Sequence, residues 1–330
     1  MKTLVTGATG FLGSAIVREL LDDGRDVRIL ARPKADMSNV EGLSLEIAHG
    51  DLLDMDSLRS AIKGCDTVYH AAAYYSFWDK NKNLIFDINV GGTRGLLQAA
   101  LELGVKKVVY TSTVGCMGLC PDGSPANEDT PHDPATLCND YKLSKFQAEQ
   151  IAKEFFAKGL PVVIVNPSTP VGPRDIKPTP TGKIVLDFLN RKTPAFVDTG
   201  LNLIDVRDCA RGHILAEEKG AVGERYILGN QNFSLREIFQ LLEKITGLKA
   251  PTVKMPYWVA YAAGWSCEMV ANYITGKPPA VPLGGVKMAK YFMYFDPAKA
   301  VRELGLPQNS VENALADAVR WFRERNMAPS

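Results

Sequence analysis

Histidine and closely paired cysteine are scarce in this chain, and their scarcity excludes the usual protein metal sites. The 330 residues include four histidines and six cysteines, and no two cysteines form a CxxC pair. A structural zinc site needs such ligands at close spacing. We therefore expect no metal site. The cysteines are expected to be reduced structural thiols, and they are Cys65, Cys116, Cys120, Cys138, Cys209 and Cys267.

An excess of charge of one sign is also missing. The chain has 38 basic and 37 acidic residues, so its formal net charge of +1 creates no bulk field that would attract nucleic acid. The first residues enter an apolar strand directly and leave no room for a secretory signal, which predicts a cytoplasmic protein.

A long uninterrupted apolar run is absent as well. The most apolar segment, from Trp258 to Ile274, is interrupted by Glu268 and Asn272, whereas a bilayer span needs about 20 apolar residues. We expect no stable membrane span. The segment is interpreted as a buried packing helix in preference to a lid over an apolar substrate or a helix that leans on a membrane.

The chain does contain an alternation of strands and helices. Apolar runs typical of strands occur at about 2–6, 26–31, 44–48, 66–70, 107–112 and 161–166, with intervals long enough for helices. This order predicts an α/β fold with a Rossmann-type, doubly wound parallel sheet. A proline-rich stretch at 167–182 breaks the pattern. We expect an NAD(P)-binding domain over residues 1–170, to which residues 201–228 return, and a smaller substrate-capping α/β domain over residues 171–330.

A glycine-rich loop follows the first strand. Gly7 permits a tight turn, Gly10 lets the backbone approach a pyrophosphate, and Gly13 allows close helix packing. The helix that follows directs its N-terminus at the phosphates. The loop therefore predicts a dinucleotide cofactor.

Tyr141 and Lys145 point to redox chemistry at a carbon that bears oxygen. A spacing of four residues places both side chains on one face of a helix. A phenol with an ordinary pKa near ~10 is a poor base at neutral pH, and a nearby ammonium lowers the pKa of such a group. We expect Lys145 to have this effect on Tyr141.

These motifs, with several others in order, resemble the extended short-chain dehydrogenase/reductase superfamily along nearly the whole chain. The resemblance implies a Thr113, Tyr141, Lys145 catalytic set, with Thr113 favoured over Ser112 as the donor to the substrate oxygen. The residues that it implies for cofactor binding are Gly7, Thr9, Gly10, Phe11, Leu12, Gly13, Asp51, Leu52, Ala71, Ala72, Ala73, Asn89, Thr111, Ser112, Tyr141, Lys145, Asn166, Pro167 and Ser168.

The end of the second strand bears on the choice of cofactor. An acidic residue there would accept the ribose hydroxyls of NAD, whereas this chain offers Arg32 and Lys34, which suit a 2′-phosphate. NADP(H) is favoured and NAD(H) remains possible. The alternative is that Arg32 is only a solvated surface charge.

Three functions stay open within the resemblance. The first is an NADP(H)-dependent reductase of a carbonyl substrate, similar to dihydroflavonol-4-reductase-like proteins. The second is an NAD-dependent sugar epimerase, because the chain also resembles the hopanoid-associated sugar epimerase family. The third is a regulator that senses NADP without catalysis. The substrate is expected to be a small-molecule carbonyl or sugar, and the expected substrate contacts are Tyr75, Trp78, Thr113 and Thr169. The resemblance also implies a homodimer.

Overall fold

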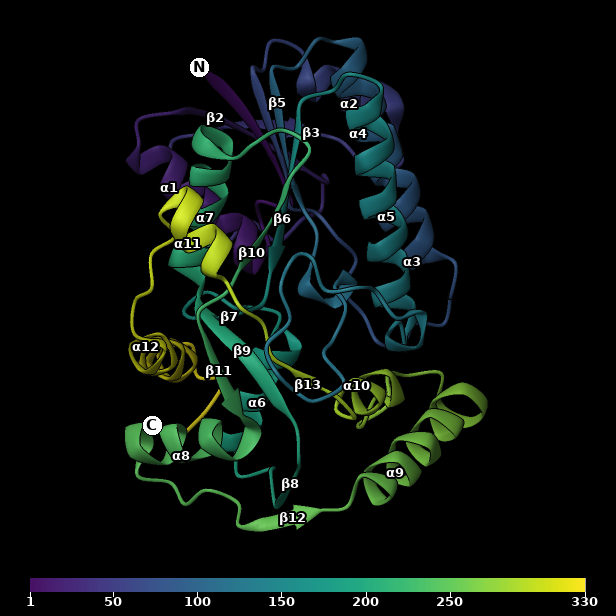
Figure 1. The fold of residues 1–330 in the computed structure, drawn as a ribbon, viewed down its shortest axis with the longest axis vertical. Coiled ribbons are helices and arrows are strands. Elements are labelled where there is room, and N and C mark those ends of the chain that lie inside the picture. The colour runs from purple at the N-terminus through teal and green to yellow at the C-terminus, as the bar shows by residue number, and fades with distance from the viewer. Residues whose placement is uncertain (330) are drawn as a thin grey trace.

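The computed structural model describes residues 1–329, which form a large parallel sheet, a smaller mixed sheet and the helices that cover them (Figure 1). The large sheet has seven strands in the order β10-β6-β5-β4-β1-β2-β3, and every neighbouring pair is parallel. The predicted Rossmann-type sheet is confirmed. Its strands are β1 (Lys2–Thr6), β2 (Asp26–Ala31), β3 (Glu46–His49), β4 (Thr67–His70), β5 (Lys107–Thr111), β6 (Val162–Pro167) and β10 (Arg225–Leu228).

Helices cover both faces of this sheet, which is why its strands are apolar throughout rather than alternating. One face is covered by α1 (Phe11–Asp22), α7 (Val206–Lys219) and α11 (Ala298–Leu304), and the other by α2 (Met55–Ile62), α4 (Thr93–Glu102) and α5 (Asp140–Ala157). Each face has its own hydrophobic core.

Local signals set the ends of these helices. Asp54 caps α2 by accepting hydrogen bonds from the backbone of Asp56 and Ser57, and Asn139 caps α5 through the Lys142 amide. The helical segment between β4 and β5 is built in three parts, α3 (Leu84–Phe86), the π-helical η1 (Asp87–Gly92) and α4. Short 3₁₀ turns, η2 (Val114–Cys116) and η3 (Pro134–Thr136), lie between β5 and α5.

The second half of the chain builds the smaller sheet below the carboxyl ends of the parallel strands (Figure 1). β9 (Gly200–Asp205) pairs with β7 (Thr169–Val171), β11 (Gln231–Ser234) and β13 (Phe292–Met293), and a separate pair joins β8 (Ala195–Val197) to β12 (Val253–Met255). A third core joins this sheet to α6 (Pro180–Leu189), α8 (Leu235–Thr246) and α12 (Val311–Glu324).

Residues 206–228 return to the large sheet as α7 and β10, whereas β9, which precedes them, belongs to the smaller sheet. The division of the chain into two domains at residue 170 stays a prediction.

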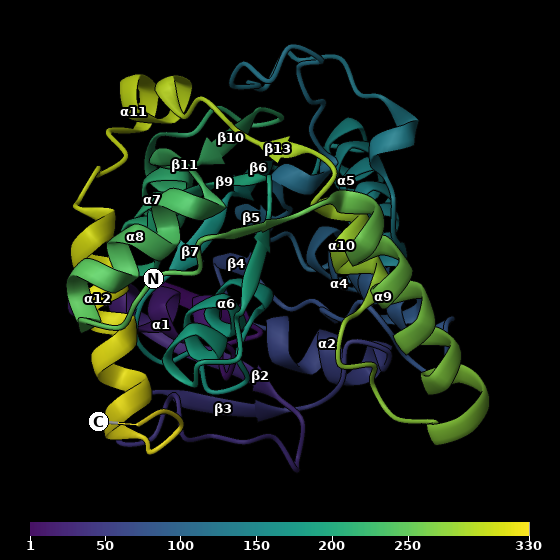
Figure 2. The ribbon, with the colours of Figure 1, turned by 90° about the horizontal axis from the view of Figure 1, so that it is seen from below.

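The segment from Trp258 to Ile274 is helical but is not a buried packing helix, so the favoured interpretation of it is wrong. It forms α9 (Tyr257–Val270) and η4 (Ala271–Thr275), which with α10 (Leu283–Met288) lie on the opposite side of the molecule from α8 and α12 (Figure 2). Trp258 is 72% exposed and Trp265 is 52% exposed. No helix within residues 1–329 is long and apolar enough to cross a membrane.

Candidate functional site

The glycine loop fits a dinucleotide. A Cβ atom added at Gly7 would lie 2.7 Å from the Ala72 backbone, and one at Gly13 would lie 2.1 Å from the Gly7 carbonyl oxygen, so the close packing of this turn tolerates no side chain there. Gly10 is the N-cap of α1, and no side chain caps this helix. Its first backbone N–H groups are therefore available to an anion such as a pyrophosphate.

A buried hydrogen-bond chain supports the loop from beneath. His70, at the end of β4, bonds through Nδ1 to the Thr6 hydroxyl (2.8 Å) and through Nε2 to the Thr93 hydroxyl (3.0 Å). The Ala72 amide donates to the same Thr6 hydroxyl at 3.3 Å. Burial lowers the pKa of His70 to about 3, so the imidazole is neutral and its role here is structural.

Lys145 lies on α5 with its ammonium turned toward β5. Its Nζ donates to the Thr111 carbonyl oxygen at 2.7 Å and to the Tyr110 hydroxyl at 3.1 Å, and it also lies 4.7 Å from the centre of the Tyr110 ring. The side chain is buried without an ion pair among residues 1–329, and burial lowers the pKa of Lys145 to about 8. Tyr110 was not among the site residues predicted from sequence.

Tyr141 lies one turn earlier on α5. Burial raises the pKa of the Tyr141 phenol well above its ordinary value, the neighbouring Tyr75 adds to the shift, and the Thr113 side chain opposes it. The direction is opposite to the one expected from sequence, because burial of the phenol dominates its pKa, and the Lys145 ammonium is bonded to Tyr110 and Thr111 instead. In this structure the phenol is protonated at neutral pH and can donate a proton.

Thr113 and Ser112 point to different partners. The Ser112 hydroxyl donates to the buried Glu149 carboxylate at 2.6 Å. The Thr113 side chain is half-buried and accepts a hydrogen bond from the Gly115 amide at 3.1 Å. It also lies close enough to the Tyr141 phenol to oppose the rise in the pKa of that group. This arrangement favours Thr113 over Ser112 as the hydroxyl that faces a substrate.

Glu149 was also missed by the sequence analysis, although it connects three strands. Besides Ser112 on the β5 side, it accepts from the Asn166 amide of β6 at 3.0 Å and forms an ion pair with Arg225 of β10 at 3.4 Å. The Asn166 amide also donates to the Thr113 carbonyl at 3.0 Å. The Oδ1 atom of Asn166 and the Ser168 hydroxyl are buried and have no protein partner within residues 1–329, as expected of groups left for a bound molecule.

Two residues that were predicted to touch the cofactor have their side chains committed to the protein. Asn89, on η1, accepts from the Tyr74 amide at 2.7 Å and donates to the Tyr74 carbonyl and the Ser144 hydroxyl, both at 3.0 Å. Asn89 thereby joins the backbone of Tyr74 to α5. The Thr111 hydroxyl bonds to His213 at 3.1 Å, so only its carbonyl reaches Lys145.

The residues predicted to contact substrate are only partly brought together. Tyr75 stacks on Tyr141, with ring centroids 4.1 Å apart, and Phe77 packs edge-on against Tyr75. Trp78 lies farther along and donates from its indole to Asn272 of η4 at 2.7 Å. Thr169 is in β7, at the start of the smaller sheet.

Arg32 and Lys34 directly follow β2, which is the neighbour of β1 and its glycine loop. Both side chains are exposed, and neither forms an ion pair within the described residues 1–329. Asp51 and Leu52 follow β3 on the same side. The cations are therefore free to pair with an anionic group held beside the loop.

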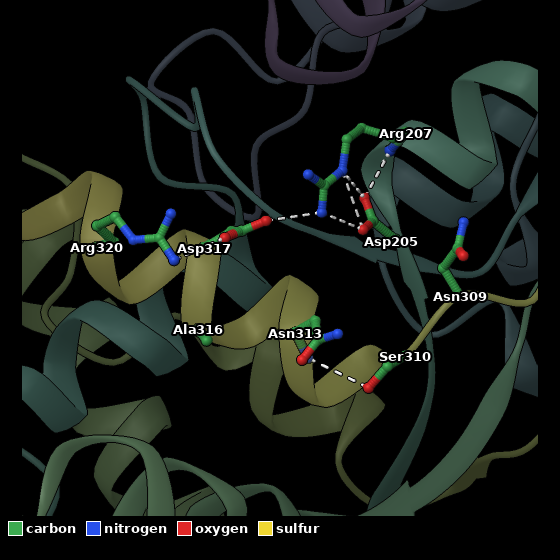
Figure 3. Close-up of a pocket in the computed structure, with 8 residues that line it drawn as sticks. All are labelled: Asp205, Arg207, Asn309, Ser310, Asn313, Ala316, Asp317 and Arg320. Atoms are coloured by element: carbon green, nitrogen blue, oxygen red, sulfur yellow. Dashed lines mark hydrogen bonds and ion pairs between the residues drawn. The ribbon is translucent and has the colours of Figure 1, made fainter.

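A separate hollow of about 530 Å³ lies between the start of α7 and α12 (Figure 3). Its charges compensate one another, since Arg207 pairs with Asp205 and with Asp317 at 2.8 Å, and Arg320 pairs with Asp317 at 3.2 Å. The residues that line this hollow do not include Thr113, Tyr141 or Lys145, and we assign the hollow no function.

Known proteins resemble this chain along nearly its whole length. Residues 3–229 match the NAD dependent epimerase/dehydratase family. The chain is 48% identical to a Synechocystis protein named "Putative dihydroflavonol 4-reductase", over 97% of this chain and 94% of the relative. It is 37% identical to sterol demethylase protein B of Methylococcus capsulatus, over 99% of this chain and all of the relative.

Among solved structures, a nucleoside-diphosphate-sugar epimerase from Pseudomonas aeruginosa superimposes with a TM-score of 0.83 at 27% identity, over 99% of both chains.

The buried lysine predicts a pH-dependent stability difference. Its pKa is about 8 in the folded protein and 10.5 when unperturbed, so the unfolded state holds the proton more strongly. Charging Lys145 therefore costs stability below pH 8, and this cost disappears as the pH rises from 8 to 10.5. Relative to Lys145→Met, which has no amine to titrate, the wild type should gain about 3 kcal/mol of unfolding free energy as the pH rises from 7 to above 10.5, and most of this gain should be present at pH 10.

Urea unfolding at pH 7 and pH 10 measures this difference. Lys63→Met, at an exposed position, serves as the control and should show no such trend. A stability difference between Lys145→Met and the wild type that stays constant with pH would show that the ammonium is not destabilised by burial.

Proposed function

Because the chain belongs to the NAD dependent epimerase/dehydratase family of NAD(P)-dependent enzymes, we propose that it is an NADPH-dependent reductase of an apolar carbonyl substrate. The observation that carries the proposal is the pair of free cations, Arg32 and Lys34, after β2. A 2′-phosphate is the group that distinguishes NADP from NAD, and cations at this position suit it. NADPH is the cofactor of reductive turnover, whereas an epimerase retains one NAD.

The state of Tyr141 supports reduction. A reductase must give a proton to the oxygen of the reduced carbonyl, and the buried phenol is protonated at neutral pH. When bound, the nicotinamide supplies the hydride. In this proposal the chain's own groups orient the carbonyl through the Thr113 hydroxyl, donate the proton from Tyr141, and hold the nicotinamide ribose through Lys145.

The substrate side favours an apolar molecule. Tyr75 stacks on the Tyr141 ring and Phe77 packs edge-on against Tyr75, so two aromatic side chains extend from the phenol. The names of two relatives refer to a dihydroflavonol and a sterol. A nucleotide sugar would instead need groups for its pyrophosphate, and the stretch before Tyr294 offers only Lys287 and Lys290 rather than the bidentate arginines that suit this group.

A nucleotide-sugar epimerase is the second candidate, and the likeness to the Pseudomonas aeruginosa epimerase is the observation that favours it. The two functions differ in how the cofactor is used. The reductase exchanges its cofactor at every turnover, whereas the epimerase keeps NAD bound and returns the hydride to the same substrate.

Tyr141→Phe should lower kcat by about a thousandfold, because it removes the proton donor, while NADPH affinity changes little. Thr113→Val should lower kcat by about tenfold to a hundredfold. Ser124→Ala, which removes an exposed hydroxyl in the loop between β5 and α5, is the control and should keep kcat within about threefold. The measurement is steady-state reduction of a panel of aromatic ketones and aldehydes with NADPH. Full activity of Tyr141→Phe would refute the assignment of the proton donor.

The double variant Arg32→Ala/Lys34→Ala should raise the Kd of NADPH by about tenfold to a hundredfold, and it should leave the Kd of NADH within about twofold. Fluorescence titration measures both constants. Lys63→Ala removes an exposed lysine elsewhere and is the control. Equal changes in the two constants would contradict recognition of the 2′-phosphate by these residues.

A further inference from the structure

The helical segment α9–η4 exposes an apolar surface that no part of the described chain covers. We call this surface the lid face. It consists of Trp258, Tyr261, Trp265, Met269, Val270, Tyr273 and Ile274, each of which is at least 38% exposed. Tyr273 and Ile274 are the most exposed, at 78% and 77%. Single exposed apolar residues are ordinary, but an apolar run along one helix indicates an interaction site.

The lid face is exposed because α9 packs through its small residues. Only Ala260, Gly264 and Ala271 are buried in α9 and η4. A Cβ atom added at Gly264 would lie 3.1 Å from the Val286 side chain of α10, so the two helices approach closely along this narrow line. The large side chains of α9 consequently point away from the molecule rather than into a core.

Positive charge accompanies this surface. Residues 76–83 and 253–290 contain six of the chain's 38 basic residues but only two of its 37 acidic residues, Asp79 and Glu268. One of the six, Lys254, is paired with Asp198 at 2.7 Å, which leaves five. The Asp79 carboxylate is engaged by the Tyr74 hydroxyl and the Asn81 amide. The hydrogen bond from Trp78 to Asn272 holds the neighbouring Lys80 and Lys82 near the lid face. Lys277 lies two residues after the end of η4. The rest of the chain therefore has more acidic than basic residues.

We propose that the lid face docks onto the surface of an anionic lipid bilayer. Tryptophan and tyrosine partition into the interface between headgroups and acyl chains, and lysines near that surface are attracted to anionic lipids. Because the described chain has no membrane-crossing helix, the segment lies on the bilayer rather than across it. A second copy of the chain is a poorer occupant, since pairing two lid faces would bring their lysines together.

The docked surface adjoins the substrate side of the site. Asn139, the cap of α5, donates to the Gly284 carbonyl of α10 at 3.3 Å, and Phe77 packs beside Gly284. Docking would therefore bring the bilayer close to the Tyr75 and Tyr141 side of the molecule, with α10 between the lid face and these residues. The docking itself does not depend on which cofactor or carbonyl the site uses.

Co-sedimentation with vesicles tests the proposal. The full chain should bind phosphatidylglycerol vesicles at least tenfold more tightly than phosphatidylcholine vesicles, and binding should weaken at high salt. Tyr273→Ser/Ile274→Ser should weaken binding to phosphatidylglycerol at least tenfold, while its melting temperature and its NADPH affinity stay at wild-type values. The control, Val222→Ser, replaces a similarly apolar residue that is 42% exposed in the loop before β10, and it should bind vesicles normally.

Two results would overturn the proposal. One is that the wild type does not bind phosphatidylglycerol vesicles, or binds them no better than the double variant. The other is that size-exclusion chromatography finds an oligomer which only Tyr273→Ser/Ile274→Ser dissociates, because the lid face would then be an interface between copies. NADPH titration of the same samples separates either result from a failure of the proposed reductase.

Discussion

The buried Lys145 ammonium is the contact on which the rest of the site depends. It joins α5 to the end of β5 by bonding to the Thr111 carbonyl and the Tyr110 hydroxyl. Burying a charged lysine in a dry interior is costly unless its N–H groups are paired, so its neighbours must provide acceptors in fixed positions. The parallel sheet therefore fixes the position of Lys145. Tyr141 lies one turn earlier on the same helix, so its position is fixed as well.

A second layer of buried polar contacts holds this arrangement. Glu149 ties the ends of β5, β6 and β10 to α5, and Asn89 ties the Tyr74 backbone to α5 through Ser144. Such networks are stable only when every member is satisfied. Two buried groups without partners, the Asn166 oxygen and the Ser168 hydroxyl, lie at the end of β6, among the residues that the family resemblance assigns to cofactor binding. The Asn166 oxygen is therefore the member of this network that is left for a bound molecule.

The parts of the structure that could be predicted from the sequence are those that depend on patterns of neighbouring residues. The strand positions, the glycine loop and the Tyr141–Lys145 spacing depend on residues that are close in the chain. The role of Tyr110 as the partner of Lys145 depends on residues 35 positions apart, and the Trp78–Asn272 bond joins residues 194 apart. The exposure of α9 was missed for the same reason: its apolar composition predicts burial, whereas burial is decided by the elements that pack around it.

The central claim is that this chain exchanges NADPH rather than retaining NAD. The most direct measurement denatures the freshly purified protein, identifies any nucleotide that is released, and titrates the stripped protein with NADPH and NADH. The account predicts little retained nucleotide and tighter binding of NADPH than of NADH. One tightly held NAD⁺ per chain would contradict it and would make the epimerase the better description of the site.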